Sequence, residues 1–257
     1  MKNLKEQLNS GRLAVGTMIS EVRNPNIVYL LAQSGFDYII VDNEHGTYST
    51  EDISNLVAAA RGAEIAVIVR IPEIRRETIL KPLDSGAAGL LVPQVETAEQ
   101  ARQIIHHAKY PPMGQRGVGL RRAHSLYGRF DAGEYLRQAN EQTLIIVQAE
   151  SQTAIDNLDQ IIAVEGIDAV FVGPFDLSVN LGIPGDLTHP KEIQAIDKVV
   201  KVCRKHKTIA GIHMFDVAQI TQWIAKGMRL ISYSSDINML ADAAMKDVAQ
   251  IKKCIDD

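Results

Sequence analysis

The stretches Leu144-Ile145-Ile146-Val147-Gln148-Ala149-Glu150 and Ala169-Val170-Phe171-Val172-Gly173-Pro174-Phe175-Asp176 have the same layout, an apolar run that ends at a carboxylate. Continuous Val, Ile, Leu and Phe runs are typical of strands buried on both faces of a parallel sheet. Because the runs are one strand–helix repeat apart, we expect Glu150 and Asp176 just beyond the carboxyl ends of sequential strands. Neighbouring strands lie about 4.8 Å apart, so such carboxylates repel each other unless they share a cation. The pair therefore predicts a metal site.

Eight apolar runs of this kind alternate with segments of helical spacing. The helix-start signal Ser49-Thr50-Glu51-Asp52, for example, precedes an i, i+3, i+4, i+7 apolar pattern. This alternation predicts an α/β fold, a single (β/α)8 TIM barrel over residues 1–257. A doubly wound open sheet is the alternative, but residues 19–23 lack the Gly-rich phosphate turn that follows its first strand. The expected strands are Leu13–Met18, Tyr38–Val41, Ala66–Val69, Gly89–Val92, Leu144–Val147, Ala169–Val172, Thr208–Ile212 and Leu230–Tyr233.

Composition narrows the class of protein. A chain of 257 residues with 46% hydrophobic residues can bury one large core. The net charge is −4 and no basic run interleaves with aromatics, which argues against a nucleic-acid partner. Cys203 and Cys254 form neither a disulfide framework nor metal-ligand spacing. No apolar signal core begins the sequence, and no stretch approaches the ~18 residues of a membrane span. We therefore expect a cytoplasmic protein with no membrane partner.

Three segments depart from the regular alternation. Residues 1–10 predict a short amphipathic helix, with Leu4 and Leu8 on one face, that fits as a plug for the barrel floor. Residues 110–143 form a long connection between the fourth and fifth strands, which is typical of functional or interface-forming segments. The last helix, from about residue 237, has an apolar stripe that fits either an ordinary eighth barrel helix or an oligomer contact. The stripe comprises Leu240, Ala244, Val248, Ile251 and Ile255.

Polar side chains gather where the expected strands end, and barrel enzymes hold their catalytic residues at these ends. Each also has an ordinary explanation. Glu150 and Asp176 fit helix caps, His45 fits a loop histidine, and Arg70 fits a partner for a rim carboxylate. None of the 13 lysines follows an apolar run at its carboxyl end, so Schiff-base chemistry has no candidate residue. If the protein performs carbonyl chemistry, a metal must supply the electrophile.

Several motifs, in order along nearly the whole chain, resemble the HpcH/HpaI aldolase/citrate lyase family, specifically its class II, metal-dependent 2-oxo acid aldolase branch. They are Phe36–His45, Val69–Arg70, Leu91–Pro93, Gln115–Gly119, Val147–Glu150 and Val172–Ser178. The resemblance implies reversible cleavage of 4-hydroxy-2-oxo acids to pyruvate and an aldehyde through a metal-bound pyruvate enolate. It also implies a small-molecule substrate and a homohexamer of swapped dimers, with the C-terminal helix packing on a neighbouring subunit.

The resemblance further implies a role for each site residue. Glu150 and Asp176 match the ligands of a divalent metal, commonly Mg, Mn or Co. His45 matches the base, and Asp84 matches the aspartate that makes this histidine more basic. Arg70 matches the arginine that stabilises the transition state. The substrate-binding positions match Gln148, Gly173, Pro174, Phe175 and Asp176.

Alternatives and departures accompany this assignment. An oxaloacetate decarboxylase, or another enolate-forming lyase, uses the same first half of the reaction. A CoA-thioester lyase is less favoured, because no segment predicts a basic nucleotide pocket. A non-catalytic barrel would lack one of the four central groups, and all four are present. Asn43 replaces a usual glycine, Phe175 a small residue and His213 an apolar residue, and these changes bear on the aldehyde half of the predicted site.

Overall fold

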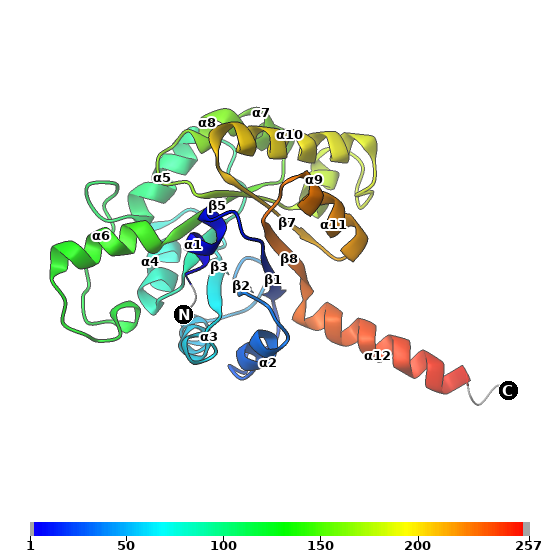
Figure 1. The fold of residues 1–257 in the computed structure, drawn as a ribbon, viewed down its shortest axis with the longest axis horizontal. Coiled ribbons are helices and arrows are strands. Elements are labelled where there is room, and N and C mark those ends of the chain that lie inside the picture. The colour runs from blue at the N-terminus through cyan, green and yellow to red at the C-terminus, as the bar shows by residue number, and fades with distance from the viewer. Residues whose placement is uncertain (1–2, 254–257) are drawn as a thin grey trace.

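Eight parallel strands close into a barrel in chain order in the computed structural model, which describes residues 3–253 (Figure 1). Each strand pairs with its sequence neighbours, and β1 closes the ring against β8. The predicted (β/α)8 fold is confirmed, and the expected runs differ from the strands by only one or two residues at their ends. The strands are β1 (Ala14–Ile19), β2 (Tyr38–Asp42), β3 (Ala66–Arg70), β4 (Gly89–Val92), β5 (Leu144–Ala149), β6 (Ala169–Val172), β7 (Ile209–Met214) and β8 (Leu230–Ser235).

Helices follow the strands and cover the outside of the barrel. Ser49 caps α3 (Thr50–Gly62) with a capping box, in which its hydroxyl accepts from the Asp52 N–H and its own N–H donates to the Asp52 carboxylate, as the sequence predicts. The apolar stripe of α3 then packs inward. The other helices are α2 (Ile27–Gln33), α4 (Arg76–Ser85), α5 (Ala98–Ala108), α7 (Gln152–Asp156), α8 (Leu158–Ile162), α9 (Pro174–Asn180), α10 (Pro190–His206) and α11 (Val217–Lys226).

The strands bury both faces, and this produces two cores. Ile39 and Val41 of β2 point outward to the helices, whereas Tyr38 and Ile40 point into the barrel. The interior core also contains Leu4 and Leu8 of α1 (Leu4–Asn9), which lies over the centre of the ring of strands (Figure 1). The predicted floor plug is therefore confirmed, and it leaves the carboxyl ends of the strands as the open end of the barrel.

The long connection after α5 is ordered and contains η1 (Ala123–Ser125) and α6 (Ala132–Gln142). The buried ammonium of Lys109 donates to the carbonyls of Asn140 and Thr143, each at 2.7 Å. Asn140 exchanges hydrogen bonds with both backbone groups of Tyr110. The two ends of the connection are thus tied to each other beside the start of β5.

The last helix, α12 (Asp236–Lys253), projects away from the barrel (Figure 1). Leu240, Val248 and Ile251 of its apolar stripe are 65%, 47% and 66% exposed. The interpretation as an ordinary eighth barrel helix is therefore wrong, and the oligomer contact stays a prediction. Ile255 and Cys254 lie outside the described residues. Between residues 3 and 253, no helix is long and apolar enough to cross a membrane.

Candidate active site

A paired arginine and aspartate stand at the carboxyl ends of β2 and β3. Asp42 and Arg70 are register partners, and the guanidinium donates to both carboxylate oxygens, Nε to Oδ1 at 2.9 Å and Nη2 to Oδ2 at 2.7 Å. The third nitrogen, Nη1, lies 3.1 Å from the Glu44 carboxylate. Burial opposes the charge of Asp42, but the hydrogen bonds and charge of Arg70 outweigh burial and lower the pKa of Asp42. Arg70 is thus a fixed, buried positive charge at the barrel mouth.

Asp42 also shapes the loop that carries His45. Its Oδ1 accepts from the backbone N–H groups of Glu44 at 3.1 Å and His45 at 3.3 Å. The His45 side chain is 68% exposed, and its Nε2 lies 3.9 Å from the Glu44 carboxylate. The backbone of His45 is therefore anchored, while its imidazole stays open to an incoming ligand.

A second polar group lies at the end of β5. Gln148 and Glu150 are two residues apart, so both side chains point to the same side. One Glu150 oxygen accepts from the backbone N–H of Gln94 at 2.7 Å, and the other accepts from the Gln148 amide. The Oε1 atom of Gln148 is buried and has no hydrogen-bond partner in the described part of the chain. This arrangement leaves an unpaired oxygen beside a buried carboxylate.

Asp176 brings a further carboxylate to the same cavity. It lies in the first turn of α9 and lines a space of about 400 Å³ together with Glu44, His45 and Glu150. Burial raises the pKa of Glu150 to about 7, and the nearby charges of Asp176 and Glu44 add to this increase. Burial also raises the pKa of Glu44. The cavity therefore holds more negative charge than its own side chains neutralise.

Gly173 makes the close approach of these groups feasible. A Cβ atom at this position would lie 2.7 Å from Nε2 of Gln148 and 2.9 Å from the Glu150 carboxylate. Pro174 follows as the first residue of α9 and is buried. A larger residue at position 173 would therefore displace the side chains of Gln148 and Glu150.

The donor set fits a hard divalent cation. Helix capping does not explain Glu150, because the Ser151 hydroxyl caps α7, and no side-chain cap bond involves Asp176 at α9. Over residues 3–253, no group of three or more His, Cys, Asp and Glu side chains forms a metal cluster. A cation here would therefore have two carboxylate ligands and complete its shell with substrate and water oxygens, as Mg²⁺ commonly does.

The structure does not bring Asp84 to His45 within one chain. Asp84 lies in the last turn of α4, which returns the chain to the amino ends of the strands, whereas His45 follows the carboxyl end of β2. Its carboxylate accepts a 2.7 Å hydrogen bond from Nη2 of Arg116, whose side chain is 4% exposed. His45, Arg70, Gln148 and Glu150 lie at the carboxyl ends of the strands, as the sequence predicts, whereas Asp84 lies at the opposite end of the barrel.

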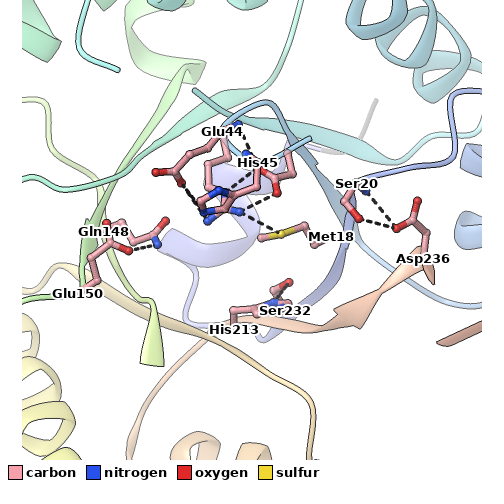
Figure 2. A network of polar contacts seen from close by, with 11 residues as sticks. Met18, Ser20, Glu44, His45, Gln148, Glu150, His213, Ser232 and Asp236 are labelled. Carbon is pink, nitrogen blue, oxygen red and sulfur yellow. Dashed lines mark hydrogen bonds and ion pairs between the residues drawn. The ribbon is translucent and has the colours of Figure 1, made fainter. Parts of the chain in front are cut away.

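Figure 2 shows Met18, Gln148, Glu150 and His213 around the same opening. His213 of β7 lies 2.9 Å from the Ser232 hydroxyl through its Nδ1. Burial, followed by the charge of Arg70, lowers the pKa of His213 to about 4, so the ring is neutral at physiological pH. Glu44 and the Gln94 N–H also belong to the site, and no role was predicted for them from the sequence, although both follow predicted strands.

The fold and this site define a (β/α)8-barrel enzyme with an acidic centre at the carboxyl ends of its strands. Residues 17–243 match the HpcH/HpaI aldolase/citrate lyase family, and the chain belongs to this family. The predicted resemblance is therefore confirmed, and the protein is an aldolase-type lyase by relationship.

Named relatives cover almost the whole chain. A 2-keto-3-deoxy-L-rhamnonate aldolase of Salmonella gallinarum (strain 287/91 / NCTC 13346) is 36% identical over 249 residues, 96% of this chain and 92% of the relative. The crystal structure of an HpcH/HpaI aldolase from Desulfitobacterium hafniense DCB-2 has a TM-score of 0.94 at 37% identity, covering 97% of this chain and 96% of that one. The citrate synthase SbnG has a TM-score of 0.90 at 27% identity, covering 99% of both chains.

Proposed function

We propose that the protein is a divalent-metal-dependent aldolase that reversibly cleaves 4-hydroxy-2-oxo acids to pyruvate and an aldehyde. The observation that carries the proposal is the meeting of Glu150 and Asp176 in one cavity with His45, beside the fixed charge of Arg70. The aldolase names of its relatives support this reaction class.

Glu150 and Asp176 are the residues that would hold Mg²⁺, Mn²⁺ or Co²⁺. A divalent cation bound there would polarise a substrate ketone and would offset the negative charge that develops on its oxygen. Gly173 and Gln148 lie against Glu150, and together with Pro174, Phe175 and Asp176 they are the proposed contacts of the 2-oxo acid. Because the buried Oε1 atom of Gln148 is an acceptor without a partner, it gains one when a water or a ligand hydroxyl in the site donates to it.

Arg70 and His45 have separate tasks in this proposal. Arg70 is held by Asp42 and Glu44, so its positive charge is in place before negative charge develops on the substrate. His45 is exposed at the cavity and takes the proton from the 4-hydroxyl as the C–C bond breaks. In the reverse direction it returns this proton to the aldehyde oxygen.

Asp84 can assist His45 only from another copy of the chain, since its own His45 lies at the other end of the barrel. The exposed apolar stripe of α12 supports such an assembly. We infer a homohexamer in the cytoplasm, in which the amino end of one barrel approaches the mouth of another.

The test is release of pyruvate by metal-stripped and metal-restored enzyme. With EDTA, cleavage of a 4-hydroxy-2-oxo acid should fall to the uncatalysed rate, and Mg²⁺, Mn²⁺ or Co²⁺ should restore it. Parallel assays with oxaloacetate distinguish the aldolase from a decarboxylase. Full cleavage after chelation contradicts the proposal, and so does a kcat/KM for oxaloacetate that exceeds those of all hydroxy-oxo acids.

A further inference from the structure

A row of three rings runs beside the proposed metal site, from the end of β7 to the first turn of α9. Phe215 packs edge-on against His213, with ring centroids 4.9 Å apart, and against Phe175 at 5.9 Å. Phe215 and Phe175 are 40% and 50% exposed, although each is large and apolar. Phe175 directly precedes Asp176, so this row begins one residue from a carboxylate that lines the cavity where the 2-oxo acid is proposed to bind.

His213 contributes the one polar atom of this row that lacks a protein partner. Its Nδ1 is engaged by the fully buried Ser232 hydroxyl, its register partner on β8. Its Nε2 has no partner among residues 3–253, and it is not one of the buried unpaired atoms, so it is open to solvent or ligand. The charges of Arg70 and Asp42 reach this ring, which places it within range of the reacting groups.

The ring is neutral, so it can pair with a hydroxyl in either tautomer. When Ser232 donates to Nδ1, the proton lies on Nε2, which then donates to a hydroxyl oxygen. In the other tautomer, Nε2 accepts from the hydroxyl proton. A carboxylate can use only the first tautomer, and an alkyl group can use neither.

The charge of the site also selects against an anionic aldehyde. Asp42, Glu44, Glu150 and Asp176 contribute four carboxylates, and Arg70 already pairs with two of them. A divalent cation and the carboxylate of the 2-oxo acid leave the mouth net negative. A second carboxylate on the aldehyde half would therefore meet repulsion from the carboxylates of the site.

We propose that His213 is a specificity-determining residue that exchanges a hydrogen bond through Nε2 with a hydroxyl of the aldehyde half, so that the enzyme selects uncharged hydroxyaldehydes. In this proposal, Phe215 and Phe175 flank the carbon chain of the aldehyde. The inference rests on the proposed function and names the substrate class of the same site.

The test is aldol addition of pyruvate to three aldehydes: glyceraldehyde, propanal and succinic semialdehyde. Propanal has the same carbon chain as glyceraldehyde without its hydroxyls, and succinic semialdehyde adds a carboxylate. The wild-type kcat/KM should be highest for glyceraldehyde. In H213L the ratio of glyceraldehyde to propanal should fall about 5- to 10-fold, the value of one net hydrogen bond. An unchanged ratio in H213L, or a wild-type preference for propanal or succinic semialdehyde, overturns the inference.

Further variants separate specificity from damage to the fold. H213Q keeps a donor and an acceptor on the side chain and should retain most of the glyceraldehyde preference. S232A removes the partner of Nδ1 and should lower the ratio by a smaller factor than H213L. H106L makes the same substitution at an exposed histidine of α5 and should leave the ratio unchanged. Equal loss of preference in H213Q and H213L would contradict the hydrogen-bonding role.

The two proposals fail in different ways. If wild-type enzyme releases pyruvate from a 4-hydroxy-2-oxo acid only with metal, while H213L keeps the wild-type aldehyde ratio, only the role of His213 is overturned. If wild-type enzyme releases no pyruvate with any of the three metals, the proposed function itself is overturned.

Discussion

Asp42 and Arg70 are paired at the ends of adjacent strands, and two hydrogen bonds of 2.9 and 2.7 Å join the guanidinium to both carboxylate oxygens. This two-point contact fixes the direction of the guanidinium as well as its position. The remaining nitrogen faces Glu44 on the loop of His45. A single strand register thus places a charge-stabilising group and a candidate base on the same side of the barrel mouth.

Replacing Arg70 by lysine tests the need for this geometry. Lysine keeps the charge but cannot bond both oxygens of Asp42 in a plane. We expect R70K to lower kcat/KM for cleavage about 100-fold, in the range seen when one charge-stabilising donor is lost. R102K alters an exposed arginine on α5 and is the matched control. A loss of less than about threefold in R70K would show that charge alone suffices.

Replacing Asp42 by asparagine tests the pair as a structural element. The amide no longer balances the buried guanidinium, and one of its two terminal atoms becomes a donor facing a donor. Breaking one side of a buried ion pair costs about 3 kcal/mol, so D42N should lower the free energy of unfolding by that order. Urea unfolding followed by circular dichroism measures the change. D247N, at an exposed position of α12, should leave the free energy of unfolding almost unchanged. Equal stability of D42N and D247N would refute the structural role of the Asp42–Arg70 pair.

The sequence predicts the barrel well, because strands buried on both faces leave continuous apolar runs that polar residues end. Those ends locate Glu150, Arg70, His45 and Gln148 without any knowledge of packing. The position and partner of Asp84 could not be predicted in this way. Asp84 lies at a helix end, and its partner Arg116 lies in a loop 32 positions later. Whether α12 contacts another copy of the chain is likewise not encoded in its apolar spacing.

Gly173 provides a test of how tightly the proposed metal ligands are packed. In G173A the new methyl group would lie within 3 Å of both Gln148 and Glu150, so one of them must move. We expect Mn²⁺ affinity to fall at least 10-fold, as when groups that orient metal ligands are lost. Mn²⁺ titration followed by electron paramagnetic resonance gives the affinity. In G133A of α6 the new methyl group would have no neighbouring atom closer than 3.5 Å, so this variant should bind Mn²⁺ as wild type does. Comparable Mn²⁺ affinities of G173A and G133A would contradict the packing argument.

Glu192 gives the stability of the protein a pH dependence. Its carboxyl is fully buried in the first turn of α10 and both oxygens lack a partner in the described part of the chain. Burial raises its pKa to about 7 from an ordinary value of 4.5. The folded state therefore binds this proton more tightly than the unfolded state, and the stabilisation present below pH 4.5 is lost as pH rises through 7.

We expect the free energies of unfolding of E192Q and wild type to diverge as the pH rises. E192Q should match wild type at pH 5 and be more stable by about 1 to 3 kcal/mol at pH 8, because it never ionises. Thermal or urea unfolding across this range gives the difference. E51Q, at an exposed position of α3, should show no such pH-dependent gain. A constant difference between E192Q and wild type from pH 5 to pH 8 would rule out ionisation of Glu192 as the cause.

The finer parts of the site depend on contacts between distant segments. The Gln94 N–H reaches Glu150 only because residue 94 adopts a positive φ of 53° after β4. The neutral state of His213 results from burial, and its Ser232 contact from the register of β7 with β8. Residue type and spacing reveal which side chains follow strands, but not these backbone directions or the local loss of solvent.

In the proposed function, a cation held by Glu150 and Asp176 would promote loss of a proton from C3 of pyruvate. Proton–deuterium exchange at this methyl group, followed by NMR, tests the claim without any aldehyde. With Mg²⁺ or Mn²⁺ we expect fast exchange in wild type, and we expect exchange at the uncatalysed rate after chelation and in E150Q and D176N. Exchange that continues at the wild-type rate with EDTA, or in both variants, would contradict the account.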